Sequence, residues 1–286
     1  MKILLAKDAG YCFGVRDAVD LAYETAEKYG DVYMLGHIVH NENVVHALDE
    51  AGAKVVDTLD EVPDDKPILF RAHGTSVDTW VDAKAKDMNI VDATCPLVLE
   101  IHEEVKKLES EGRKIIIVGD HGHDEVVGIA SQVKDPIIVG TPKEAQALRK
   151  TKRAGVVSQS TQTIENVQEI INIIMTKVFD LRFVNTICFP TKRNQIQIKE
   201  LAKQCDVMIV IGSFTSANSK RLTALAKARN KNSYQVTCAD EIQTDWLAGA
   251  EVVGLSAGAS TPDNIIDEVL TKIKEIGNVP EEMVYG

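Results

Sequence analysis

The stretch NIVDATCPLVLEIHEEV (residues 89–105) decides the fold of this chain, because it joins a strand-like run to an amphipathic helix through one cysteine. The run before Cys95 is rich in apolar and β-branched residues, and Pro96 follows where the first turn of a helix tolerates a missing N–H. Two other segments repeat this plan, and each contains one cysteine: ILLAKDAGYCFGVRDAV (residues 3–19, with Cys12) and VNTICFPTKRNQIQIKEL (residues 184–201, with Cys188). The sequence therefore predicts three similar units with one equivalent cysteine each.

The three cysteines are expected at or near helix starts, where the positive end of the helix dipole favours thiolate over thiol. Three equivalent thiolates suggest a metal centre on a pseudo-threefold axis. The sequence has five cysteines, an odd number, and no CxxC pair, which argues against a disulfide framework and against the usual structural zinc site. An iron–sulfur cubane can take three thiolates and leave one iron open. A zinc site completed by a histidine, and three inert buried cysteines, remain as alternatives.

The predicted fold class is α/β, with three similar small domains, mostly parallel sheets, and a pseudo-threefold arrangement around a central iron–sulfur site. Apolar strands alternate with amphipathic helices along the chain, the pattern of α/β units. We expect the first domain at residues 13–95, the second at 96–188 and the third at 189–280. The N-terminal strand, residues 2–6, is expected to join the third domain.

The third unit has a pattern that differs from the other two at its end. We expect helices at residues 193–204, 241–248 and 262–276, and no strand after the last helix. The strand at residues 3–6 precedes the first unit and has no place in it. We therefore predict that this strand completes the sheet of the third unit.

Composition limits the classes of partner. The formal charge is −11, so nucleic acid and anionic membranes are poor principal partners for this acidic surface. The apolar run near the N-terminus is too short for a signal peptide, and no stretch reaches the roughly 18 to 20 apolar residues of a membrane span. We expect a soluble, cytoplasmic protein that binds neither nucleic acid nor membrane.

Six polar loops are predicted at the carboxyl ends of strands, where ligands bind in open parallel sheets and where helix N-termini gather. They read LGHIVHN, FRAHGTS, VGDHGHDE, VSQSTQT, IGSFTSANS and LSAGASTP. Five of the seven histidines fall in these loops: His37, His40, His73, His121 and His123. Glycine, serine and threonine let backbone N–H groups approach an anion, and histidines add hydrogen-bond donors. This chemistry indicates a phosphorylated small molecule, and the absence of a Walker motif argues against a nucleotide.

Simpler interpretations compete for individual residues. Serine or asparagine at a helix start also serves as an ordinary N-cap. Cys205 and Cys238 are interpreted as small buried apolar residues, and His102 as a packing residue within a helix. Three arginines near the loops are interpreted as structural or surface residues: Arg71, Arg193 and Arg221.

Eight segments carry a family resemblance: GYCFGV, HNENVV, FRAHGTS, DATCPLV, GHDEVVG, SQSTQT, TSANSKRL and SAGASTPD. In this order, along essentially the whole chain, the sequence resembles the 4-hydroxy-3-methylbut-2-enyl diphosphate reductases. These act last in the methylerythritol phosphate route to isoprenoids. The resemblance covers all three cysteine contexts and all six loops, so it is highly specific.

The resemblance implies an oxygen-sensitive 4Fe-4S cluster with Cys12, Cys95 and Cys188 as its three ligands and one open iron. It implies reductive removal of an allylic hydroxyl with two electrons and two protons, giving isopentenyl and dimethylallyl diphosphate. A ferredoxin or flavodoxin type protein would donate the electrons. A noncatalytic iron–sulfur carrier or sensor is the alternative from another class, although it has no use for six polar loops. A zinc-dependent hydrolase of phosphorylated substrates is a third possibility.

The resemblance also implies roles for single residues. Glu125 matches the family's acid, and its carboxyl must be protonated when needed, which a dry site beside a diphosphate favours. Ser160 or Thr161 falls at the position near the substrate hydroxyl. Six residues are expected to contact the diphosphate: His40, His73, His123, Ser216, Asn218 and Ser260. The family often has a second serine where this chain has Ala217, which removes one hydroxyl from the expected site.

Overall fold

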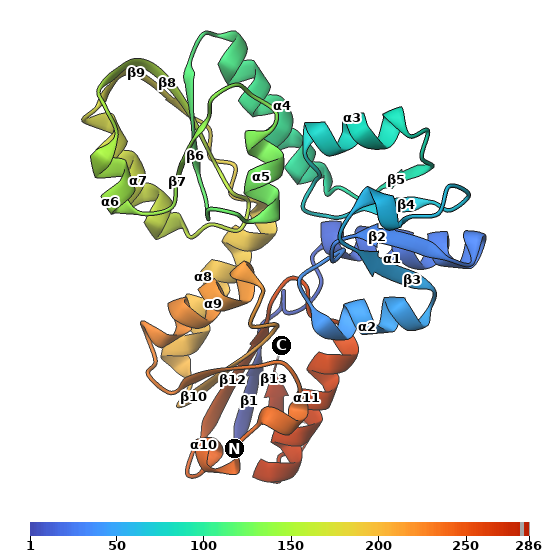
Figure 1. The fold of residues 1–286 in the computed structure, drawn as a ribbon. Helices are drawn as coiled ribbons and strands as arrows, with labels where there is room; N and C mark the ends of the chain where they lie inside the picture. Colours follow the sequence, from blue (N-terminus) through green and yellow to red (C-terminus); the bar gives the residue numbers. More distant parts are fainter. Residues whose placement is uncertain (281–282, 286) are drawn as a thin grey trace. The chain divides into compact units, whose positions relative to one another are not determined.

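The computed structural model describes residues 1–280 and 283–285 (Figure 1). The chain forms two compact units. Unit 1 comprises Met1–Val15, His40–Val44 and Phe189–Gly286, and unit 2 comprises Arg16–Val39 and Val45–Cys188. Unit 1 contains one parallel sheet, and unit 2 contains two.

The first sheet of unit 2 has the order β3-β2-β4-β5, and all its strands are parallel. Its strands are β2 (Val32–Leu35), β3 (Ala53–Val56), β4 (Ile68–Phe70) and β5 (Ile90–Asp92). The associated helices are α1 (Phe13–Tyr29), α2 (Glu42–Glu50), η1 (Leu59–Glu61) and α3 (Val77–Ala85). All three residues of β4 are fully buried, as expected for a central parallel strand covered on both faces.

The second sheet of unit 2 has the order β7-β6-β8-β9 and is again parallel. Its strands are β6 (Lys114–Val118), β7 (Ile137–Val139), β8 (Thr151–Ser158) and β9 (Val178–Phe183). The helices are α4 (Pro96–Ser110), α5 (Asp124–Ala130), α6 (Pro142–Ala147) and α7 (Ile164–Met175). The buried isoleucines and valines of β6 and β8 form the core with the apolar faces of α4, α5 and α7.

The sheet of unit 1 has the order β11-β10-β12-β1-β13. Its strands are β1 (Lys2–Leu5), β10 (Val207–Ile211), β11 (Ser233–Val236), β12 (Val252–Ala257) and β13 (Val284–Tyr285). The helices are α8 (Phe189–Gln204), α9 (Ala217–Lys227), η2 (Ala239–Glu241), α10 (Thr244–Leu247) and α11 (Asp263–Gly277). β1 pairs in parallel with β12, which is the pairing expected of the N-terminal strand.

The structure confirms three similar α/β domains with parallel sheets, and it corrects several elements. A two-residue strand, β13, does follow the last helix and pairs with β1, so the prediction of no strand there was wrong. The helix predicted at residues 241–248 is shorter in the structure: the 3₁₀ turn η2 ends at Glu241, whose carboxylate accepts the Thr237 N–H at 2.6 Å, and α10 follows. β9 ends at Phe183 and α8 begins at Phe189, earlier than predicted, with Pro190 in its first turn.

The strand order explains where ligands can bind in each sheet. The six polar loops follow β2 and β4, β6 and β8, and β10 and β12. In every sheet these two strands are neighbours, and the next strands along the chain lie on opposite sides of them. Each pair is therefore a point where the strand order reverses, and the crevice beyond its carboxyl ends is the expected ligand site.

Among the described helices, none combines the length and the apolar character that crossing a lipid bilayer requires.

Candidate active site

Each of the three repeated cysteines directly precedes a helix. Cys12 lies before α1, Cys95 occupies the N-cap position of α4, and Cys188 lies before α8. All three are half-buried, and no disulfide links cysteines in the part of the chain that the structure describes. The helix starts place partial positive charge beside each sulfur, which favours the thiolate that a metal ligand must be.

The backbone of each cysteine is tied to an equivalent loop. The Cys95 N–H donates to the Ala72 carbonyl at 3.0 Å, after β4. The Cys188 N–H donates to the Ser160 carbonyl at 3.0 Å, after β8, and the Cys12 N–H donates to the Ala259 carbonyl at 3.3 Å, after β12. The same hydrogen bond therefore occurs in all three domains and connects each cysteine to a loop with an expected substrate contact.

Glu125 lies in the first turn of α5 and is 1% exposed. One carboxylate oxygen accepts the Ser160 N–H at 2.5 Å, and the other accepts the Ser160 hydroxyl at 2.7 Å. Since the Ser160 carbonyl accepts the Cys188 N–H, a continuous chain of hydrogen bonds connects the carboxylate to a cysteine backbone. The carboxylate is thus fixed in orientation and shielded from bulk water, as a positioned acid–base group requires.

His123 is the N-cap of α5, and its Nδ1 accepts the backbone N–H of Glu125 at 3.2 Å. A ring nitrogen that accepts a hydrogen bond carries no proton, so this cap requires a neutral imidazole with its proton on Nε2. His73, from the loop after β4, lies with its ring centroid 5.6 Å from that of His123. The two rings thus bring together loops from the two sheets of unit 2.

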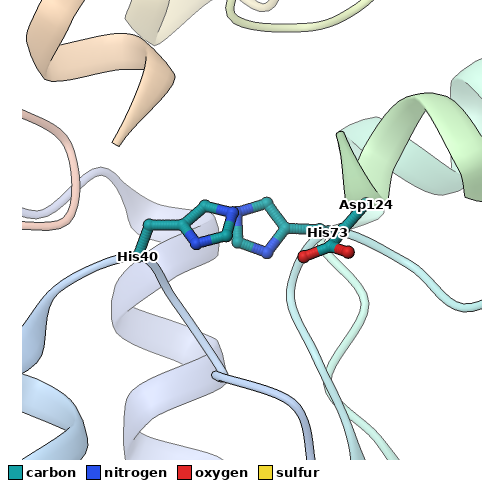
Figure 2. A group of neighbouring side chains, drawn as sticks. All are labelled: His40, His73 and Asp124. Carbon is teal, nitrogen blue, oxygen red and sulfur yellow. The ribbon is translucent and has the colours of Figure 1, made fainter. Parts of the chain in front are cut away.

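Asp124 and Arg71 lie beside these rings. Figure 2 shows the Asp124 carboxylate beside the His73 ring, with ligand atoms of the two residues within 4.8 Å of each other. Arg71 Nη1 lies 2.6 Å from Asp124 Oδ2. Asp124 had no role predicted from the sequence, and Arg71 was interpreted as structural or surface. No local pattern could pair residues from two different domains.

The start of α9 in unit 1 is a second site with anion-binding character. Ser216 is the N-cap, and its Oγ accepts the Ser219 N–H at 3.3 Å. A Cβ on Gly212 or Gly258 would collide with the Ser219 side chain, so these glycines let the loop backbones pack against the helix start. Among the described residues, no hydrogen-bond partner exists for the buried Asn218 Nδ2. A buried donor without a partner at a helix N-terminus is well suited to a bound anion.

Ser260, in the loop after β12, is also in unit 1 and is nearly buried. Its hydroxyl donates to the His40 carbonyl at 3.2 Å, which fixes the chain at His40 just before α2. Glu42, at the start of α2, accepts the Ser213 hydroxyl at 2.7 Å and the Thr215 hydroxyl at 3.2 Å. Unit 1 therefore brings His40 together with the loops after β10 and β12.

Three further residues of the predicted polar loops are Thr161, His37 and His121. Thr161 is half-buried, and its Oγ1 accepts the Gln159 amide at 3.1 Å within the same loop as Ser160. His37 and His121 are exposed, and His121 pairs with Glu144 at 2.9 Å. The Gly140 N–H and His121 lower the pKa of Glu144. His121 therefore pairs with the partly exposed Glu144 rather than with the buried Glu125.

His102, within α4, is 6% exposed and packs against Gly74 in the loop that carries His73. Burial lowers the pKa of His102, so the neutral ring is favoured. The interpretation as a packing residue agrees with this environment. Cys205 is similarly enclosed, and burial raises the pKa of its thiol, which fits an inert apolar role.

Comparison with known proteins decides the family. The model of the LytB protein family matches residues 3–274. This chain belongs to the LytB family. The 4-hydroxy-3-methylbut-2-enyl diphosphate reductase of Geobacter metallireducens is 42% identical over 277 residues, covering 96% of this chain and 98% of the relative. The reductase of Geobacter sulfurreducens is 41% identical over 279 residues, covering 97% and 99%.

Solved structures agree with the LytB assignment. A structure of (E)-4-hydroxy-3-methyl-but-2-enyl diphosphate reductase, the terminal enzyme of the non-mevalonate pathway, has 37% identity and a TM-score of 0.72, covering 96% of this chain and 100% of its own. The structure of the reductase from Plasmodium falciparum has 27% identity and a TM-score of 0.91, covering 100% and 91%. LytB enzymes are iron–sulfur proteins. The comparisons confirm the predicted family and support the reductase interpretation over the carrier alternative.

Proposed function

We propose that this LytB chain reduces (E)-4-hydroxy-3-methylbut-2-enyl diphosphate to isopentenyl and dimethylallyl diphosphate. The reaction removes an allylic hydroxyl and consumes two electrons and two protons. The observation that carries the proposal is the hydrogen-bond chain from the Glu125 carboxylate through Ser160 to the Cys188 backbone. The proposed proton donor and the proposed cluster ligand are both hydrogen-bonded to Ser160.

The proposed cofactor is a 4Fe-4S cluster held by Cys12, Cys95 and Cys188, with the fourth iron open. The donor set fits this group, because three half-buried cysteines each precede a helix and each donates its N–H to an equivalent loop carbonyl. These contacts orient the cysteine backbones, and the sulfurs would be the ligands. When bound, the cluster supplies electrons and a Lewis acid for the hydroxyl oxygen.

The proposed diphosphate contacts come from both units. In unit 2 they are the imidazoles of His73 and His123, and His123 donates through Nε2 because Nδ1 already caps α5. In unit 1 the contacts are His40, Ser216, Asn218 and Ser260, of which Asn218 offers a buried amide donor. Ala217 contributes only a backbone N–H at the first position of α9. Helix-start N–H groups and neutral donors can bind a diphosphate without an arginine clamp.

Glu125 is proposed as the proton donor to the hydroxyl that leaves. Hydroxide is a poor leaving group, so protonation at that oxygen lowers the barrier. Ser160 holds the carboxyl through both oxygens, and Ser160 or Thr161 is proposed to lie near the substrate hydroxyl. The electron donor is proposed to be a small protein of the ferredoxin or flavodoxin type.

Anaerobic purification followed by turnover tests the proposal. We expect a brown protein whose visible absorption is bleached by oxygen or dithionite. We further expect a chemically reduced donor to support conversion of the hydroxylated diphosphate to both products. A colourless, air-stable zinc protein, or an iron–sulfur protein that does not convert the diphosphate, would contradict the proposal.

A further inference from the structure

An ion pair joins the two sheets of unit 2 beside the proposed diphosphate-binding histidines. Arg71 lies in the loop after β4, two residues before His73, and Asp124 is the first residue of α5, between His123 and Glu125. Arg71 Nη1 and Asp124 Oδ2 are 2.6 Å apart, and the two side chains are 23% and 28% exposed. The pair is therefore partly shielded from solvent and is not a loose surface contact.

The Asp124 carboxylate is electrostatically out of place at an anion site. It lies within 4.8 Å of a ring nitrogen of His73, whose ring is 5.6 Å from that of His123 (Figure 2). A full negative charge beside histidines that bind a diphosphate would repel that anion, and a partly shielded site screens the repulsion poorly.

Helix α5 explains why an acidic residue is at this position. Asp124 is in the first turn, where a carboxylate stabilises the positive end of the helix dipole. Asp124 thus stabilises the start of the helix that carries Glu125, but its negative charge repels a bound anion. A cation that pairs with the carboxylate reduces this repulsion, and Asp124 can still stabilise the start of the helix.

Arg71 is held in place for this pairing. Its guanidinium packs over Gly36, whose φ is +70°, and a Cβ on Gly36 would lie 2.8 Å from Arg71 Nη1. The glycine therefore leaves space that the guanidinium fills. The same Nη1 that lies over Gly36 also pairs with Asp124.

We propose that Arg71 is a positioning residue that neutralises Asp124, so that His73 and His123 can bind the diphosphate. Arg71 acts through Asp124 and does not itself contact the anion. The inference rests on the proposed function, because it takes these two histidines as part of the diphosphate site.

Three variants test the proposal in the cluster-loaded enzyme under anaerobic conditions. The probe is inorganic pyrophosphate, with affinity measured by calorimetry, and KM and kcat are measured in parallel. Arg71→Gln removes the guanidinium charge beside the carboxylate and is expected to weaken pyrophosphate binding about tenfold and to raise KM with little change in kcat. Asp124→Asn alone is expected to bind equally well or more tightly. The double variant is expected to recover affinity to within about threefold of the unaltered chain.

Recovery in the double variant separates charge compensation from two competing roles for Arg71. A direct contact between Arg71 and phosphate, or a purely structural role for the ion pair, predicts that the double variant binds as weakly as Arg71→Gln. That result, or unchanged affinity in Arg71→Gln, would overturn the proposal. Lys54→Gln is the matched control, since it removes the same charge from the pair with Asp31 at the opposite end of the first sheet and should leave affinity unchanged.

Turnover by the unaltered chain tests the proposed function independently. If that chain fails to convert the hydroxylated diphosphate, the proposed function fails, whereas the affinity pattern still reports on Arg71 and Asp124.

Discussion

Replacing Glu125 by glutamine should greatly reduce turnover while leaving the fold almost unchanged. The glutamine carbonyl can still accept the Ser160 N–H, as the carboxylate does at 2.5 Å. Its amide can donate to the Ser160 hydroxyl, 2.7 Å away in the native structure, because a hydroxyl both donates and accepts. The variant exchanges charge-assisted hydrogen bonds for neutral ones, so we expect a loss of about 1 kcal/mol in the free energy of unfolding.

The expected effect on catalysis is much larger. A positioned general acid contributes a factor of roughly 10² to 10⁴, which corresponds to about 3–5 kcal/mol of activation free energy. The assay is anaerobic turnover with a reduced artificial donor, together with the visible spectrum and the affinity for pyrophosphate. We expect kcat to fall by that factor while the spectrum and affinity remain. Glu144→Gln is the control, because Glu144 accepts the Gly140 N–H at 2.7 Å but is more exposed and lies in α6 rather than α5. Near-normal kcat in the Glu125 variant would remove it from the mechanism.

Other side chains are open to equally direct tests. Serine in place of Cys12, Cys95 or Cys188 should reduce bound iron and sulfide and abolish turnover, whereas Cys205→Ser should change neither; retention of the full iron and sulfide content in all three variants would exclude them as ligands. Asn218→Ala should raise KM by roughly 10- to 100-fold, because its buried amide then cannot donate to the charged ligand; an unchanged KM would remove Asn218 from the site. Because burial holds the pKa of His102 below its ordinary 6.5, the unfolded chain binds the proton more readily, and the free energy of unfolding should fall as the pH drops below about 6.5. His102→Gln should show a smaller fall between about pH 7.5 and about pH 5.5 in denaturant titrations, and an equal fall would assign the pH dependence to other groups.

Local sequence signals predicted the features that depend on neighbouring residues. Pro96 after Cys95 marks a helix start, and the structure makes Cys95 the N-cap of α4. Alternating apolar and polar segments predicted three parallel sheets, because buried strands and amphipathic helices each carry their own periodicity. The sequence also predicted that the N-terminal strand joins the third sheet, where β1 pairs with β12, since this strand had no place in the first domain.

Features that depend on tertiary contacts could not be predicted from the sequence. β13 has two residues, too few for any periodic signal, and its pairing with β1 stabilises it. The ion pair between Arg71 and Asp124 joins a loop of one domain to a helix start of another, so neither residue could be interpreted from its own segment. The cap that His123 forms on α5 also depends on a specific hydrogen bond, from the Glu125 N–H to His123 Nδ1, which the sequence alone does not reveal. The ligand roles of Cys12, Cys95 and Cys188 remain predictions.

The central claim is that three cysteines hold a four-iron cluster and leave one iron open to the substrate. Mössbauer spectroscopy of the anaerobic, isotopically enriched protein, with and without the hydroxylated diphosphate, tests it most directly. We expect three irons to give signals of sulfur-ligated sites and the fourth to give a distinct signal that shifts when the diphosphate binds. Four equivalent irons, or a spectrum that does not change on adding the diphosphate, would contradict it.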